Sequence, residues 1–132
     1  MKKMMYSLLA IGLLCAASAW AQGGQPAAET ELRPSQKAMQ ARAGWMKAMS
    51  ESLATMKYAE VGKDAAALAS QTDAAGRKLP NPLAKELTLK ISTLAMAVSD
   101  AAAKQDGETV KVKLGEIKAT CGECHAKLRD NK

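Results

Sequence analysis

The last part of this 132-residue chain carries an apolar stripe with helical spacing, and two cysteines stand on that stripe. The side chains recur at intervals of four and three residues, at Val110, Leu114, Ile117, Cys121, Cys124 and Leu128. Such intervals place side chains on one face of an α-helix, the face that turns toward a protein core. The pattern therefore predicts a helix that buries both thiols, so a group bound to them must lie inside the fold.

The two cysteines belong to the run Cys121-Gly-Glu-Cys124-His125, which contains the chain's one histidine. Cys-x-x-Cys-His is the attachment sequence of c-type haem. Its thiols form thioethers to the two vinyl groups, and its histidine binds the iron. We therefore predict one covalent haem c, bound through Cys121 and Cys124, with His125 as the proximal axial ligand.

Two other uses of a Cys-x-x-Cys pair fit this chain less well. A structural zinc ion takes four ligands, and the motif with its histidine offers three. A thioredoxin-like dithiol lies at the start of a helix that follows a strand. Because this motif stands late in a predicted helix of a chain without strand-like runs, haem is the favoured interpretation.

Residues 1–21 have the pattern of a secretory signal peptide. Lys2 and Lys3 precede an apolar stretch, and a small-x-small site allows cleavage after Ala21. Cys15 follows a leucine where lipid-attachment signals carry a small residue, so we do not expect a lipid anchor. Export to the periplasm would agree with the motif, because covalent haem attachment takes place after translocation, in an oxidising compartment.

Beyond the leader, residues 22–33 read as a flexible tail and residues 34–132 as one domain. Apolar side chains spaced by three and four, and abundant alanine, predict four helices. The first would run from about 34 to 60 and end at Gly62, with Asp64 capping the second. The second would end before Pro80. Asn81 followed by proline would open the third, and residues 105–107 would form the last turn.

Four amphipathic helices joined by short loops predict an all-α fold, an antiparallel up-down-up-down four-helix bundle that encloses a covalently attached haem. Only Trp45 and Tyr58 would remain as aromatic side chains after cleavage, and the chain has no Phe. A core of alanine, leucine and methionine is thin for this size. We therefore expect the haem to supply the missing apolar volume, and the apoprotein to be much less stable than the haem-bound protein.

The net charge argues for some partners and against others. It falls from +6 to +4 when the leader removes its two lysines. A mildly basic surface suits an acidic redox partner protein but is too weak to indicate nucleic acid. We also expect no stable membrane insertion once the leader is removed, because the apolar stretch lies within it.

The position of the motif at the end of a fourth helix resembles the cytochrome c-prime family, including its low-spin branch, the cytochromes c556. The C-terminal run from Cys121 to Arg129 is similar to the family's CxxCHxxxR ending. Arg42-Ala-Gly-Trp-Met46-Lys is similar to its RxxxM/L-K pattern in the first helix. The similarity covers roughly residues 33–131. Family members often pair through their first two helices, so the resemblance also implies a possible homodimer.

The resemblance implies roles for three further residues. Met46 would face the iron from the first helix, as distal axial ligand or as a plug over a five-coordinate iron. Arg42 would lie near the haem edge and offset the propionate charges. Arg129 would lie near His125, although a basic residue at a helix C-terminus is also favoured by the helix dipole alone.

Met46 also fits the stripe of its helix, where methionine is often simple core filler. A register error would bring Met39 or Met49 into its place instead. Ligation would make a low-spin electron carrier. A plug would make a protein that binds nitric oxide or carbon monoxide. We expect an electron carrier and not an enzyme, because a peroxidase needs a distal acid or base and the one histidine is proximal.

Overall fold

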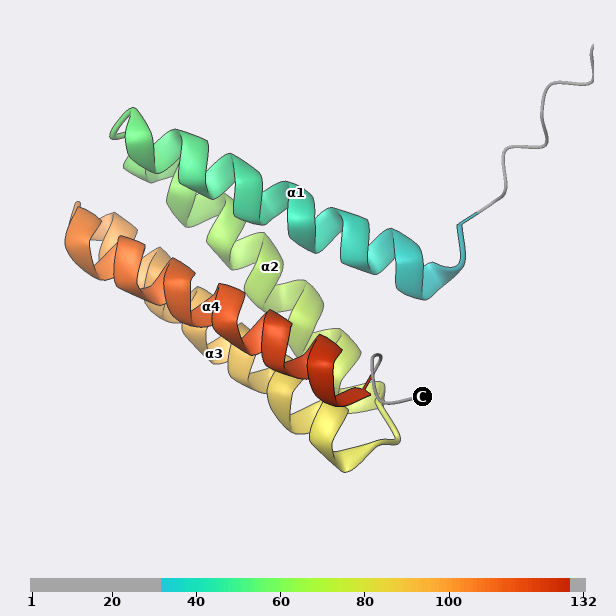
Figure 1. Ribbon diagram of the computed structural model, residues 1–132. Helices are drawn as coiled ribbons and strands as arrows, with labels where there is room; N and C mark the ends of the chain where they lie inside the picture. Colours follow the sequence, from blue (N-terminus) through green and yellow to red (C-terminus); the bar gives the residue numbers. More distant parts are fainter. Residues whose placement is uncertain (1–31, 129–132) are drawn as a thin grey trace, which may run out of the picture. The chain divides into compact units, whose positions relative to one another are not determined.

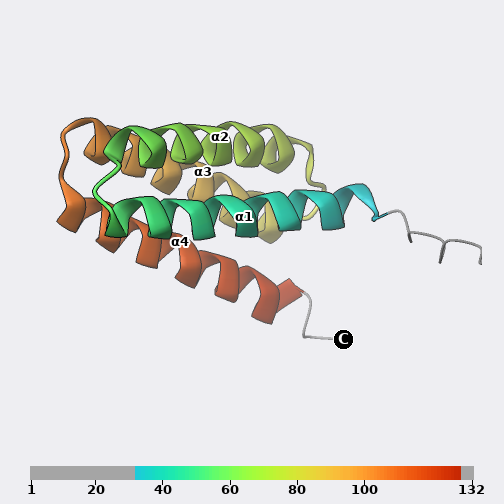
Figure 2. The same cartoon turned by 90° about the horizontal axis from the view of Figure 1, so that it is seen from above.

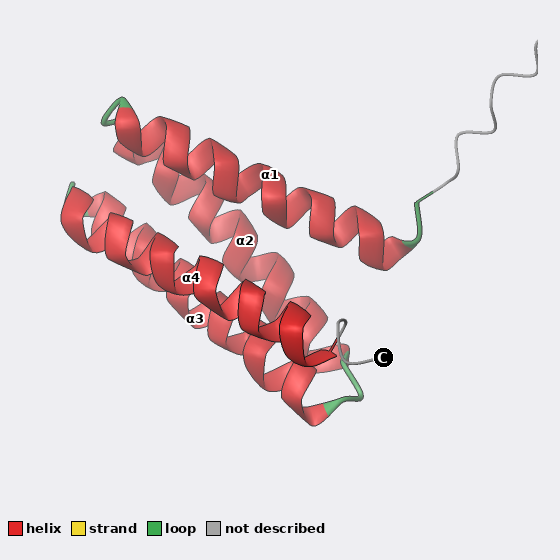
Figure 3. Ribbon diagram, in the orientation of Figure 1, coloured by secondary structure: helices red, strands yellow, loops and turns green. Residues whose placement is uncertain are grey.

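The computed structural model describes residues 32–128, and these residues form four α-helices with no strand among them (Figures 1 and 3). The helices are α1 (Pro34–Ala54), α2 (Tyr58–Lys78), α3 (Pro82–Ala103) and α4 (Gly107–Leu128). The prediction of an all-α domain built from four helices is confirmed. The predicted signal peptide, residues 22–31 of the predicted tail, and Arg129 lie outside the described residues.

The connection between α2 and α3 lies where the sequence places it. α2 ends at Lys78, before Pro80, and α3 begins with Pro82 at its first position. The Asn81 side chain caps α3, because its Oδ1 accepts a hydrogen bond from the backbone N–H of Ala84 at 3.0 Å. Asp106 does the same at the start of α4, where its Oδ1 accepts from the N–H of Thr109 at 3.0 Å.

The predicted boundary between the first two helices is wrong. α1 ends at Ala54 instead of about residue 60, and the turn stands at Thr55–Lys57, with Met56 in the left-handed region at a φ of 55°. Gly62 is not a helix end but lies within α2, where an added Cβ would lie 3.7 Å from the Cβ of Ala102 on α3. Met56 is exposed, because it stands in this turn and not on the helix face that packs on the core.

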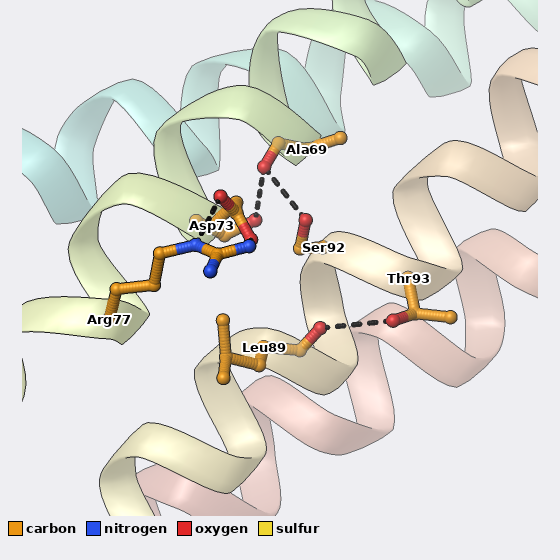
Figure 4. Close-up of polar contacts among 7 residues, drawn as sticks. Ala69, Asp73, Arg77, Leu89, Ser92 and Thr93 are labelled. Atoms are coloured by element: carbon orange, nitrogen blue, oxygen red, sulfur yellow. Dashed lines mark hydrogen bonds and ion pairs between the residues drawn. The ribbon is translucent and has the colours of Figure 1, made fainter.

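α2 and α3 form the most extensive helix pair of the domain. Small residues let their backbones approach, and a Cβ added to Gly76 would lie only 2.9 Å from Cδ2 of Leu89. Ser92 on α3 donates a hydrogen bond to the backbone oxygen of Ala69 on α2 at 2.9 Å (Figure 4). An ion pair between Arg77 and Asp73, at 2.8 Å, lies on the exposed side of α2 close to this contact (Figure 4).

The core belongs mainly to α2, α3 and α4, and α1 contributes little to it. The buried apolar side chains on those three helices include Val61, Ala65, Leu68, Ile91, Ala95, Val98, Val110, Leu114 and Ile117. Met49 is the one buried apolar residue of α1. α1 packs on α2 and makes much less contact with α4. The two diverge toward the start of α1 and the end of α4 (Figure 2).

Within residues 32–128, no helix carries an apolar stretch long enough to cross a bilayer.

Candidate functional site

A cleft of about 430 Å³ lies where α1 and α4 diverge. α1 forms one wall and the last turns of α4 form the other, with two residues of α3 between them. The lining residues are Met39, Arg42, Ala43, Met46, Lys47, Ser50, Thr88, Ile91, Lys118, Cys121, Cys124 and His125. The volume falls within the range of about 300–1,000 Å³ that is usual for small-molecule and cofactor sites.

The end of α4 holds the Cys-x-x-Cys-His motif in regular helix. Lys127 and Glu123 form an ion pair at 2.6 Å, one turn apart, which supports the helix around the motif. The buried Thr120 donates to the backbone oxygen of Glu116 at 2.9 Å, so its hydroxyl is satisfied inside the helix. The prediction that both thiols are buried holds only in part: Cys121 is half-buried and packs against the core, while Cys124 is half-buried and lines the cleft.

Arg42 is fixed across the cleft from the motif. Its Nε–H donates a hydrogen bond to Oε1 of Gln71 on α2 at 2.8 Å, and its Nη1 lies 4.0 Å from Sδ of Met39. The resemblance implies the haem propionates as anionic partners of Arg42, and that stays a prediction. Among residues 32–128 the partner of its Nε–H is the neutral amide of Gln71, so no side chain there cancels its positive charge.

The pKa values of the cleft residues reflect burial first and mutual charge second. Loss of solvent lowers the pKa of Arg42, while the negative charge of the ionised Cys121 and Cys124 thiols would raise it. Burial raises the pKa of both thiols, and the Arg42 guanidinium opposes that rise. These opposing effects indicate that the guanidinium and both sulfur atoms are close enough to interact electrostatically across the cleft.

A second cavity of about 450 Å³ continues the cleft along α1 and α4. It shares Met46, Ser50 and Lys118 with the first cavity, and its other lining residues are Leu53, Ala54, Lys111, Leu114 and Gly115. Arg42, Lys47, Lys111 and Lys118 line the two cavities together, and among residues 32–128 no carboxylate lines either of them. The groove is therefore apolar with a basic rim, which suits an apolar ligand that carries negative charge.

The structure brings five of the six predicted site residues to one cleft. Cys121, Cys124 and His125 line it from α4, and Arg42 and Met46 line it from α1. The sixth, Arg129, lies outside the described residues. In the described part of the chain, no three side chains of His, Cys, Asp or Glu gather as a metal site. A haem iron needs no such group, because the porphyrin supplies its own nitrogen ligands and the protein adds one or two axial ones.

The alternatives to Met46 separate clearly. Met49 is fully buried in the core and does not line the cleft. Met39 does line it, but remains 44% exposed near the open end of the groove. Trp45 packs against the core cluster and not against the cleft. Met46 is therefore the methionine that lies inside the groove, between the first cavity and the second.

Sequence reasoning missed Gln71 and three groove lysines, Lys47, Lys111 and Lys118. Gln71 precedes the buried Thr72 on α2, and its pairing with Arg42 depends on how α1 crosses α2, which no local pattern encodes. The lysines carry a weak signal, because Lys111 and Lys118 are seven residues apart and share a helix face.

Comparison with known proteins finds no match among family models, curated proteins or solved structures. The resemblance to the cytochrome c-prime family thus stays a prediction that depends on the motifs alone.

Proposed function

We propose that this protein is an exported monohaem c-type cytochrome that carries electrons. Cys121 and Cys124 would hold the haem through thioethers, and His125 and Met46 would be the axial ligands. The observation that carries the proposal is that the attachment motif and Met46, distant in sequence, line one cleft of about 430 Å³. Helices in an up-down-up-down, antiparallel order would close around the haem, as in other bundle proteins.

The lining of the groove supports haem over other ligands. The macrocycle is apolar on both faces and carries two propionates at its edge. Apolar side chains such as Ile91 and Leu114 would cover the faces, and the lysines at the rim would receive the carboxylates. A basic rim without carboxylates would disfavour a free divalent cation, which prefers oxygen ligands.

Each residue of the cleft has a distinct task in this proposal. When bound, haem supplies the one-electron couple, and the chain tunes it. The thiols fix the position of the macrocycle, and His125 supplies the proximal nitrogen. The sulfur of Met46 raises the reduction potential and keeps the same ligand in both oxidation states. Thr88 and Ile91 of α3 would cover the haem from the side of the core.

Localisation and partners follow from the leader and the charge. The signal peptide would direct the chain to the periplasm, with cleavage after Ala21, where haem is attached. The basic rim of the groove would favour an acidic redox partner.

A second candidate function is binding of nitric oxide or carbon monoxide at a five-coordinate iron. The second cavity favours it, because space of about 450 Å³ continues past Met46 and is lined by Leu53, Leu114 and Gly115. In that case Met46, which is only half-buried, would plug the distal side and yield to a small neutral ligand.

Spectroscopy of the exported, purified full chain tests both candidates. We expect a coloured protein whose pigment resists acid-acetone, and a low-spin signal in electron paramagnetic resonance of the oxidised form. Met46→Ala should convert the signal to high spin and admit carbon monoxide to the reduced form. Met39→Ala is the matched control, since Met39 lines the same cleft, and it should leave the spectrum unchanged.

The possible outcomes separate the candidates. A colourless chain, or one that loses its pigment to acid-acetone, would contradict haem attachment altogether. A high-spin wild type that binds carbon monoxide would select the gas-binding function. A low-spin signal that survives in Met46→Ala would remove Met46 from the axial position.

A further inference from the structure

Arg42 brings a positive charge to the cleft, and the way it is held is unusual for a half-buried arginine. Its Nε–H donates to the neutral amide of Gln71 at 2.8 Å, and the ion pairs of residues 32–128 involve other side chains. A carboxylate at position 71 would form a stronger, charge-assisted hydrogen bond. It would also cancel the charge, whereas glutamine holds the guanidinium and leaves the charge intact.

We propose that Gln71 is a positioning residue: it holds the Arg42 charge, which no side chain of residues 32–128 cancels, beside the haem, where this charge offsets the propionates and raises the reduction potential. This inference depends on the proposed haem site. It assigns a role to a residue on α2 that carries no part of the attachment motif and does not line the cleft itself.

The geometry supports a fixed charge rather than a mobile one. Arg42 lines the same cleft as Cys121, Cys124 and Met46, and it lines it from α1 while the two thiols line it from α4. Gln71 stands on α2 directly before the fully buried Thr72, and α2 is held by its extensive contact with α3. The anchor therefore belongs to the best-packed part of the domain, and Arg42 takes its position from it.

The sign of the effect follows from electrostatics. Reduction adds one electron to the iron and makes the site less positive by one unit. A nearby positive charge therefore favours the reduced state and raises the potential, more strongly where burial weakens solvent screening. If the Gln71 hydrogen bond is lost, the long arginine side chain can move into solvent, where its charge is screened.

Midpoint potentials of a small variant set test the inference in the full haem-loaded chain. Arg42→Gln removes the charge and should lower the potential by about 59 mV, a tenfold change in a one-electron equilibrium. Gln71→Glu cancels the charge in place and should lower it by a similar amount. Gln71→Leu keeps the charge but lets the side chain move. It should change the one-electron equilibrium about threefold, which lowers the potential by ~28 mV, and the potential should depend more strongly on salt.

Two comparisons make the result specific. Gln40→Glu is the matched control, because it makes the same chemical change at an exposed position of α1, and it should shift the equilibrium by less than about twofold, ~18 mV. In the Arg42→Gln background, Gln71→Leu should have no further effect, since Gln71 acts through Arg42. Circular dichroism and thermal unfolding would verify that each variant is folded.

Nuclear magnetic resonance supplies a readout that a merely structural role would not share. The Arg42 Nε–H should exchange slowly with solvent in the wild type and quickly in Gln71→Leu. An unchanged potential in folded, pigmented Gln71→Leu, or a further fall in the double variant, would overturn the inference and leave the proposed function standing. A colourless wild type would overturn both.

Discussion

The two helix pairs of this domain differ in how completely the chain fills the space between them. α2 and α3 approach closely through small side chains, and Gly76 leaves just enough room for Leu89. α1 and α4 make slight contact and are separated by two joined cavities of about 430 and 450 Å³. An added Cβ would meet nothing within 4 Å at Gly115 on α4, in contrast to Gly76 on α2.

This difference indicates that the closely packed α2–α3 pair serves mainly stability, whereas the open α1–α4 pair holds the candidate site. The buried core lies mostly on α2, α3 and the first half of α4, while the residues with chemical capability line the α1–α4 groove. α1 buries only Met49 among its apolar side chains, and Trp45, Met46 and Leu53 pack partly buried against the core, so the rest of its length is left to line the groove. A bound macrocycle would then complete the open pair with apolar contacts that the chain does not supply.

The largest expected effect is at the attachment motif. Cys121→Ala together with Cys124→Ala should abolish covalent pigment completely, because no thiol remains to form a thioether. Thermal unfolding should also show the greatest fall in Tm of any variant considered, since the open helix pair would lose its proposed occupant. The measurements are acid-acetone extraction and the melting curve of the exported protein.

Val112→Ala is the control for that experiment, because Val112 is an exposed apolar residue on the same helix. It should retain pigment and melt as the wild type does. A double cysteine variant that melts as high as the wild type would mean that the α1–α4 pair is stable without a ligand.

The next largest effects are expected at two methionines on α1, of which Met49 lies in the core and Met46 lies in the groove. Met49 is fully buried, so Met49→Ala should lower the free energy of unfolding by about 2–5 kcal/mol and leave the spectrum of the haem unchanged. Met46 is half-buried at the groove, so Met46→Ala should cost less stability and change the spin state. Urea unfolding and absorption spectra of both variants would check this. Equal spectral changes would contradict the separation of core and site.

Glycine-to-alanine substitutions should change the free energy of unfolding by a smaller amount. The change should have opposite signs in the α1–α4 pair and the α2–α3 pair. Alanine in place of glycine inside a helix gains up to about 1 kcal/mol from helix propensity alone. Gly115→Ala should gain this amount, since its Cβ meets open space. Gly76→Ala should instead lose about 1 kcal/mol, because its Cβ would press on Leu89 at 2.9 Å and overpacking costs about 1–3 kcal/mol.

Leu89→Ala combined with Gly76→Ala tests the cause of that loss. Removing the leucine side chain should make room for the new methyl group, so the two changes should cost less together than their separate effects predict. Urea unfolding of the single and double variants measures this coupling. Simple additivity would show that Leu89 is not what limits the approach of α2 and α3.

How far the sequence predicts this molecule depends on whether a signal is local. Asn81 and the proline after it mark the start of α3 correctly, because capping is decided within four residues. Gly62 misleads for the opposite reason. It lies inside α2, against Ala102 of α3, a residue 40 positions away, and the real turn contains Met56 at a positive φ, a conformation that favours glycine.

The candidate site divides in the same way. Cys121, Cys124 and His125 are contiguous, and their place on the stripe predicts correctly that Cys121 packs against the core. That Met46 lies in the groove while Met49 lies in the core depends on the rotation of α1, which a stripe containing both residues does not specify. Gln71 is beyond reach of the sequence, because its partner Arg42 stands on another helix, 29 residues earlier.

The smallest expected effect lies at the junction of α3 and α4 and concerns pH. The carboxylate of Asp106 accepts hydrogen bonds from the hydroxyl and the backbone N–H of Thr109, at 2.6 and 3.0 Å, and these bonds lower its pKa. A carboxyl with a lowered folded pKa contributes stability that is fully present above its ordinary pKa, about 3.9, and is lost as pH falls through the folded pKa.

Asp106→Asn keeps the capping oxygen but cannot ionise, so the Tm of this variant should decline less steeply below about pH 4. Thr109→Val removes only the hydroxyl and should give an intermediate slope. Melting curves between about pH 6 and pH 2 measure this, and identical slopes in all three proteins would show that the cap acts through geometry and not through charge.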